Sequence, residues 1–125
     1  MSNYIVDNKQ TLKYRHYLLL ANQEWHWFNA SPGPINRYQL KCGDNFCLVL
    51  YRNKDQTAND AYVIPFRSLK QLFTERNLVP GSNDSLRWHG TIKDGYLNLK
   101  GGIGETIAVA PFHNAFDLLS NPEEI

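Results

Sequence analysis

The chain has 125 residues, 42% of them hydrophobic and 20% charged, with a formal net charge of +1 at pH 7. This length and balance fit a single globular domain with a real core and exclude a second domain of similar size. The charge is too close to zero for a global field that would recruit nucleic acid or a membrane, so a polyanionic partner would need a local patch.

The expected compartment follows from what the sequence lacks. The longest apolar run, "YLLLA", is far shorter than a bilayer span, and the N-terminus does not have the basic-then-apolar order of a secretion signal. We therefore expect a cytoplasmic protein without membrane contact. Two cysteines, Cys42 and Cys47, are too few for a disulfide framework, and we expect both to be reduced.

The first third of the chain is the hardest to interpret. After a strand-like "YIVD", residues 11–29 carry apolar side chains too continuously for a clean period. Their length and lack of Gly or Pro favour a helix, with a pair of strands joined by a turn near "ANQE" as the alternative. The following "NASPGPINR", residues 29–37, contains two prolines around a glycine and predicts a loop.

The middle of the chain predicts two strands and a helix. The run "NFCLVLYRN" is rich in β-forming residues, "KDQTAND" breaks it with turn formers, and "AYVIP" resumes extended structure up to Pro65. Proline favours an extended residue before it and suits the start of a helix. From Ser68 onward helical spacing relates three apolar residues and leaves four polar ones on the other face, namely Leu69, Leu72 and Phe73 against Arg67, Lys70, Gln71 and Arg76.

The last third predicts three short strands joined by glycine turns. These are "LRWHGTIKDG", "YLNLKG" and "ETIAVAPF", with "KDG" as a tight hairpin turn and "HNAFDLL" as a short closing helix. Strands outnumber helices, and the turns come at short intervals. The sequence therefore predicts a mainly β fold of barrel or sandwich type with one or two short helices packed on it.

No catalytic, cofactor or metal site is expected. The four histidines are scattered without metal-ligand spacing, and "GGIGE" lacks the Lys-Ser/Thr of a phosphate-binding loop and predicts a turn. A small hydrolase using His89 or His113 would need a nucleophile and base pair that the sequence does not supply.

One segment resembles a known family. The run from Phe46 to Phe73 is similar to the B3-type DNA-binding pseudobarrel of plant auxin- and abscisic-acid-response transcription factors and of several restriction endonucleases, and looks closer to the restriction-enzyme members. In that family a first strand leads through a polar loop to a second strand that ends in a hydrophobic-Ile-Pro motif and passes at once into a short helix. Here "LVLYRN", "KDQTAND", "YVIP" and "FRSLKQLF" match these parts in order.

The resemblance implies an open β-barrel that holds the DNA major groove between two arms. The first arm is the loop between the first two strands, which carries over to Arg52, Asn53, Lys54, Asp55, Gln56, Thr57, Asn59 and Asp60. These residue types can bond guanine, adenine and cytosine edges, thymine methyls and phosphates. A simpler explanation is that any exposed turn prefers such residues.

The second arm implied by the resemblance corresponds to "RWHGTIKDGY". Alternation along this strand places Leu86, Trp88 and Ile92 on one face and four polar side chains on the other, namely Arg87, His89, Thr91 and Lys93. The polar solvent face of an ordinary barrel strand would show the same alternation.

These observations lead to one main hypothesis and one alternative. The main one is a single DNA-recognition domain over residues 1–125, with an N-terminal elaboration at 1–45, a pseudobarrel-like part at 46–119 and a tail at 120–125. It would bind double-stranded DNA sequence-specifically as the target-recognition domain or subunit of a restriction endonuclease, while a partner nuclease domain or subunit cleaves. The alternative is a non-catalytic protein-protein or RNA-binding barrel module that uses the aromatic surface from Trp25 to Phe28.

Overall fold

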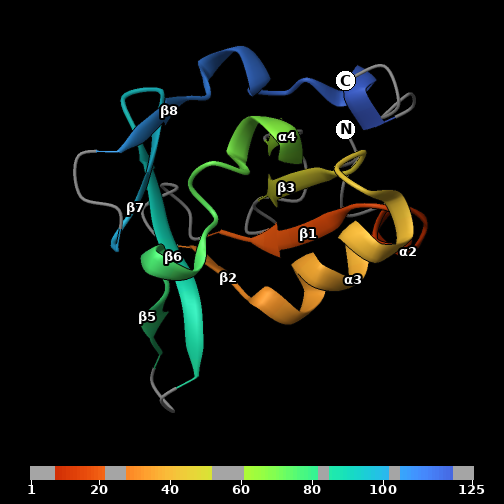
Figure 1. Ribbon diagram of the computed structural model, residues 1–125. Coiled ribbons are helices and arrows are strands. Elements are labelled where there is room, and N and C mark those ends of the chain that lie inside the picture. The colour runs from red at the N-terminus through yellow and green to blue at the C-terminus, as the bar shows by residue number, and fades with distance from the viewer. Residues whose placement is uncertain (1–7, 22–27, 52–60, 82–84, 102–104, 120–125) are drawn as a thin grey trace.

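The protein is mainly β, as the sequence predicted. The computed structural model describes residues 8–21, 28–51, 61–81, 85–101 and 105–119. Within these ranges the strands form two sheets, and they do not close into one barrel. In Figure 1 the long strand β6 stands on one side, and the other sheet, together with helices α2 and α3, lies on the other.

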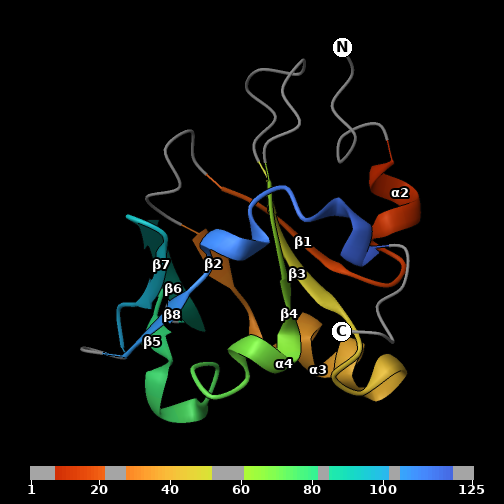
Figure 2. The ribbon, with the colours of Figure 1, turned by 90° about the horizontal axis from the view of Figure 1, so that it is seen from above.

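The first sheet has three strands in the order β1-β3-β4. Strand β3 (Cys47–Tyr51) pairs antiparallel with β4 (Ala61–Pro65) and parallel with β1 (Tyr17–Leu20). All five residues of β3 are buried, because both faces of this sheet are covered. One face packs in the main core, and the other packs on Leu12 and Leu119. Figure 2 shows β3 and β4 side by side from above.

The second sheet is antiparallel and is built around β6 (Leu86–Lys93). Strand β6 pairs with β2 (Phe28–Ala30) and with β7 (Tyr96–Leu99), and β7 pairs with β8 (Thr106–Ala108). The two-residue strand β5 (Val79–Pro80) pairs with the start of β6. The predicted "KDG" hairpin is confirmed, since Asp94 and Gly95 both have positive φ values, 53° and 81°, between the paired ends of β6 and β7.

Short helices complete the fold. Helix α2 (Lys9–Leu12) precedes β1, and α4 (Phe66–Leu69) follows β4 directly. Among the residues described after α4 there are three 3₁₀ helices, η1 (Glu75–Asn77), η2 (Ala110–Phe112) and η3 (Phe116–Leu119). The last of these confirms the short closing helix predicted over "HNAFDLL".

Two predictions for the first third of the chain are wrong. The helix expected over 11–29 is replaced by β1 and β2, so the strand alternative is correct, but the two strands pair with β3 and β6 and not with each other. The segment 29–37, expected to be a loop, instead contains the end of β2 and the first half of helix α3 (Pro32–Cys42). Prolines in a first helical turn have no intrahelical N–H bond to lose, and this is why Pro32 and Pro34 begin the helix that they were expected to prevent.

The proline corner is confirmed, with a shorter helix than predicted. Strand β4 ends at Pro65, and α4 starts at the next residue but lasts only four residues. Leu69, Leu72 and Phe73 are all buried, although only the first of them is helical. Backbone hydrogen bonds from Leu72 N and Phe73 N to Leu69 O continue the turn and point both side chains into the core.

A buried histidine joins three parts of the chain. His16 is 1% exposed, and its Nδ1 accepts a hydrogen bond of 3.0 Å from the backbone N–H of Cys47 at the start of β3. Burial lowers the pKa of His16 below 6.5, opposed by a hydrogen bond with the backbone of Leu119 and reinforced by the charge of Arg15. The ring is therefore neutral in the folded protein at pH 7.

This histidine makes the protein's stability depend on pH. The pKa of His16 is lower in the folded than in the unfolded chain, so its contribution is complete above about 6.5 and is lost as pH falls toward the folded-state value. Urea unfolding between pH 7.5 and 5 should show wild type losing stability faster than His16→Asn, whose amide oxygen can still accept the Cys47 N–H. Equal losses in the two proteins would contradict this role for His16.

Candidate functional site

The outer face of β6 carries the four polar residues that the sequence placed together. Along this strand Trp88, Gly90 and Ile92 are buried, while Arg87, His89 and Thr91 are half-buried and Lys93 is exposed. The inward side is fixed by the core, where the Trp88 indole N–H also donates to Thr74 O at 2.8 Å. The predicted alternation is confirmed from Arg87 to Lys93, whereas Leu86 at the start of the strand is 53% exposed and not buried with Trp88 and Ile92.

Neighbouring strands extend this polar face. Asn29 of β2 lies opposite His89, and Asn98 of β7 lies opposite Thr91 and, on its other side, opposite Thr106 of β8. Lys100 follows β7 and donates its backbone N–H to His89 O at 2.7 Å. We call this surface the β6 face and define it by Asn29, Arg87, His89, Thr91, Lys93, Asn98, Lys100 and Thr106.

The centre of the β6 face is a hydrogen-bonded pair. His89 Nδ1 lies 2.6 Å from Asn29 Oδ1, which fixes the plane of the imidazole. Burial lowers the pKa of His89, and the nearby charges of Lys100 and Arg87 lower it further. At pH 7 His89 is therefore a neutral group able to donate from Nδ1 and accept at Nε2.

The Arg87 side chain lies against the backbone of Gly81. Its guanidinium lies against Gly81, where an added Cβ would come within 2.3 Å of Arg87 Nε. Nε is buried and has no hydrogen-bond partner within the part of the chain that the structure describes. Gly81 keeps its place through a hydrogen bond from its N–H to Ser85 O at 2.7 Å. The Arg87 side chain therefore occupies space that is open only because residue 81 has no Cβ.

The charge of the β6 face is uniformly positive. Arg87, Lys93 and Lys100 supply cations, and strands β2, β6, β7 and β8 contain no Asp or Glu. Cations without interspersed carboxylates favour an anionic partner, and the amide, hydroxyl and imidazole groups between them offer both donors and acceptors.

The other predicted arm, from Arg52 to Asp60, lies outside the described residues. The residues on either side of it are placed, because Tyr51 and Ala61 are the last pair in the β3-β4 register. Asn114 caps this end of the hairpin by accepting the Ala61 N–H and donating to Ala61 O.

The basic residues near the proline corner are already engaged. Lys70 pairs with Asp44 at 2.9 Å, Arg76 pairs with Glu105 at 2.6 Å, and Arg67 bonds the Asn45 side chain. These contacts pin exposed side chains of the corner to other elements.

Other kinds of site receive little support from the geometry. Phe28 is 2% exposed and packs over Gly90, so it belongs to the core and not to the aromatic surface of the alternative hypothesis, whose other members Trp25 and Trp27 lie outside the described residues. His113 is exposed and stacks on Tyr62. Burial raises the pKa of Cys47 to about 12, which makes this thiol inert. In the ranges that the structure covers, no three His, Cys, Asp or Glu side chains gather as metal ligands, and no helix is long and apolar enough to cross a membrane.

Sequence reasoning missed four members of the β6 face. Asn29 was assigned to a helix or hairpin, and Asn98, Lys100 and Thr106 were left unremarked within predicted strands. Alternation in "YLNLK" already put the Asn98 side chain on the other face of the strand from Leu97 and Leu99. Only the pairing register shows that Asn98 lies beside Thr91.

No family model, curated protein or solved structure matches this chain.

The β6 face should depend on the glycine beneath it. A Cβ at Gly90 would lie 2.5 Å from the Phe28 ring and 2.9 Å from Asn98 O, so Gly90→Ala must displace β2 or β7. We expect a loss of about 1–3 kcal/mol in unfolding free energy, measured by urea denaturation. Gly33→Ala is the matched control, since its nearest neighbour would be 3.5 Å away, and it should be neutral or slightly stabilising. Equal stability of Gly90→Ala and wild type would show that Phe28 does not pack as described.

Proposed function

We propose that the protein binds double-stranded DNA sequence-specifically, using the β6 face and the loop at 52–60 as two arms of an open pseudobarrel. The observation that carries this proposal is the composition of the β6 face, which has three cations and no strand carboxylate around a row of neutral donors and acceptors. Such a surface offers phosphate contacts for affinity and base-edge contacts for specificity.

Each group on the face has a partner chemistry in the major groove. Arg87 can donate twice to the O6 and N7 atoms of guanine, and Asn29 and Asn98 have the paired donor and acceptor that adenine requires. Thr91 can bond a phosphate or contact a thymine methyl, and the long side chains of Lys93 and Lys100 reach phosphates. The groove is about 12 Å wide and admits a two-stranded ribbon such as β6-β7.

The second arm and the barrel shape rest on the order of elements in the middle of the chain. The order strand, polar loop, Ile-Pro corner and helix is present, because β3, β4 and α4 follow one another as in the B3-type family that the sequence resembles. In that family the loop between the first two strands reads bases, and here it would be residues 52–60. The cleavage function of a restriction system would then belong to a partner nuclease domain or subunit.

Selection from random duplexes tests the proposal directly. Wild type should enrich one sequence over bulk competitor at moderate salt. Arg87→Ala should weaken binding to that sequence by about 1–3 kcal/mol and reduce the base preference at one position of the site. Lys93→Ala should weaken binding to all duplexes alike and reduce the slope of log affinity against log salt concentration by about one.

Two controls separate position from charge. Arg76→Ala removes an exposed cation from outside the β6 face and should leave binding unchanged. Gly81→Ala keeps all charges but displaces the Arg87 guanidinium, which is flexible enough to move at little cost in stability. It should weaken binding as Arg87→Ala does. Failure of any duplex to outcompete bulk DNA would refute the proposal.

Duplex binding should also change the titration of His89. The pKa of His89 is lowered in the free protein, and an adjacent phosphate or guanine acceptor would favour the protonated ring and raise it. Because the bound form then holds more protons, affinity should increase as pH falls from 7 to 6, and His89→Gln should lose that increase. NMR titration of the imidazole with and without duplex measures both values, and an unchanged pKa would remove His89 from the interface.

A further inference from the structure

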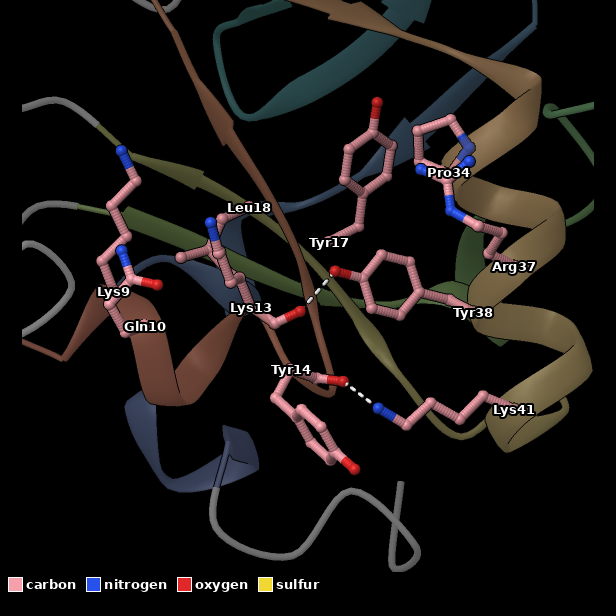
Figure 3. Close-up of a pocket in the computed structure, with 10 residues that line it drawn as sticks. All are labelled: Lys9, Gln10, Lys13, Tyr14, Tyr17, Leu18, Pro34, Arg37, Tyr38 and Lys41. Atoms are coloured by element: carbon pink, nitrogen blue, oxygen red, sulfur yellow. Dashed lines mark hydrogen bonds between the residues drawn. The ribbon is translucent and has the colours of Figure 1, made fainter.

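A second basic surface lies on the opposite part of the molecule from β6. Helices α2 and α3 and the start of β1 enclose a groove of about 730 Å³, a size suited to a small-molecule ligand. Figure 3 shows its lining, which combines four cations with three tyrosines, namely Lys9, Lys13, Arg37 and Lys41 with Tyr14, Tyr17 and Tyr38. We call this the α2-α3 groove.

Among the described residues, no carboxylate neutralises the charge in the α2-α3 groove, and none of those that line it is acidic. Lys13 and Arg37 form no ion pair within the described ranges, and residues 8–21 and 28–51 contain a single carboxylate, Asp44, which is paired with Lys70. Cations gathered in a cleft repel one another and raise the local concentration of anions.

Hydrogen bonds hold the walls of the α2-α3 groove together. The Tyr38 hydroxyl donates to Lys13 O, and Lys41 Nζ donates to Tyr14 O, so α3 is tied to the segment between α2 and β1 at two points (Figure 3). The Tyr17 hydroxyl accepts the backbone N–H of Ser31 at 3.1 Å, just before α3. Burial raises the pKa of Tyr38, which keeps its hydroxyl a donor.

The aromatic side chains supply flat surfaces beside the cations. Tyr17 and Tyr38 stack on each other at 5.9 Å, and Lys41 Nζ lies 3.2 Å from the centre of the Tyr14 ring. Tyr14 is nevertheless 73% exposed, so most of its surface is open to a ligand. A second hollow of about 470 Å³ adjoins the groove at Tyr14 and Lys41 and adds Arg15 to the basic lining.

We propose that the α2-α3 groove binds a nucleotide, with Lys13 and Arg37 on the phosphate and the Tyr14 ring against the base. A phosphate alone would use the cations but not the tyrosine, and an apolar ligand would leave the cations unpaired. A nucleotide satisfies both. The nucleotide is either free or part of a single-stranded nucleic acid, since both present the same phosphate and base.

This site does not depend on duplex binding by the β6 face. The two surfaces share no residue, so each can be removed separately. The protein carrying Arg87→Ala should bind the groove ligand as wild type does, and a protein with an altered groove should keep its folded β6 face.

The test uses the full chain and three probes, which are adenosine monophosphate, a fluorescent eight-residue oligothymidylate and inorganic phosphate. Calorimetry or fluorescence anisotropy at moderate salt should show binding of the mononucleotide, the oligonucleotide or both, with phosphate alone at least about tenfold weaker. Tighter binding of the oligonucleotide, with affinity that falls as salt rises, identifies a single strand as the source, and equal affinity per site identifies a free nucleotide.

Single substitutions test which groove residues contact the nucleotide. Lys13→Ala and Arg37→Ala should each reduce affinity about tenfold or more, and Tyr14→Ala about fivefold or more, whereas Tyr14→Phe should keep wild-type affinity. Arg76→Ala removes a cation elsewhere and serves as the matched control, and thermal melting of each variant confirms folding. The proposal is overturned if neither nucleotide probe binds, if phosphate competes as well as they do, or if the groove variants bind like the control.

Discussion

A continuous row of six aromatic rings holds the two sheets together. The centroids of neighbouring rings are 4.8 to 6.2 Å apart. The row runs from β1 through α3, the residue before β3, α4 and the turn after α4 to β6, in the order Tyr17, Tyr38, Phe46, Phe66, Phe73 and Trp88. Each contact contributes about 0.5–1.5 kcal/mol beyond the area it buries. Within the described residues the strand pairings stay inside one sheet or the other, so the relative placement of the two sheets depends on side-chain packing, to which this row contributes.

Both proposed binding surfaces lie at the ends of that row. Tyr17 and Tyr38 line the α2-α3 groove, and Trp88 is on the inner side of the strand whose outer side is the β6 face. The Ile-Pro corner lies at the middle of the row. It turns the chain at Pro65, so that the next residue, Phe66, stacks on Phe46. A core of interlocking rings is stiff, and stiffness is what a polar surface needs if its donors are to meet fixed acceptors.

Where local chemistry decided the structure, the sequence was sufficient. Asp94-Gly95 requires positive φ, Pro65 ends a strand, and alternation separates Trp88 from His89, and all three were predictable. The failures came where tertiary contacts prevailed. The apolar residues of β1 are continuous because both faces of its sheet are covered, which removes the period that identifies a strand. Half of the candidate interface could not be predicted either, since Asn29 reaches His89 only through a pairing of residues 60 apart.

The parallel pairing of β1 with β3 has a consequence for how the chain folds. The β3-β4 hairpin and the β6-β7 hairpin are local and can form early, but Tyr17 reaches Leu48 only after the whole of α3 has been placed between them. The α2-α3 groove is made by this late step, whereas the β6-β7 half of the other face is not. A full-length chain refolding from the unfolded state would therefore present part of its β6 surface before its groove exists, and the two surfaces would form one after the other.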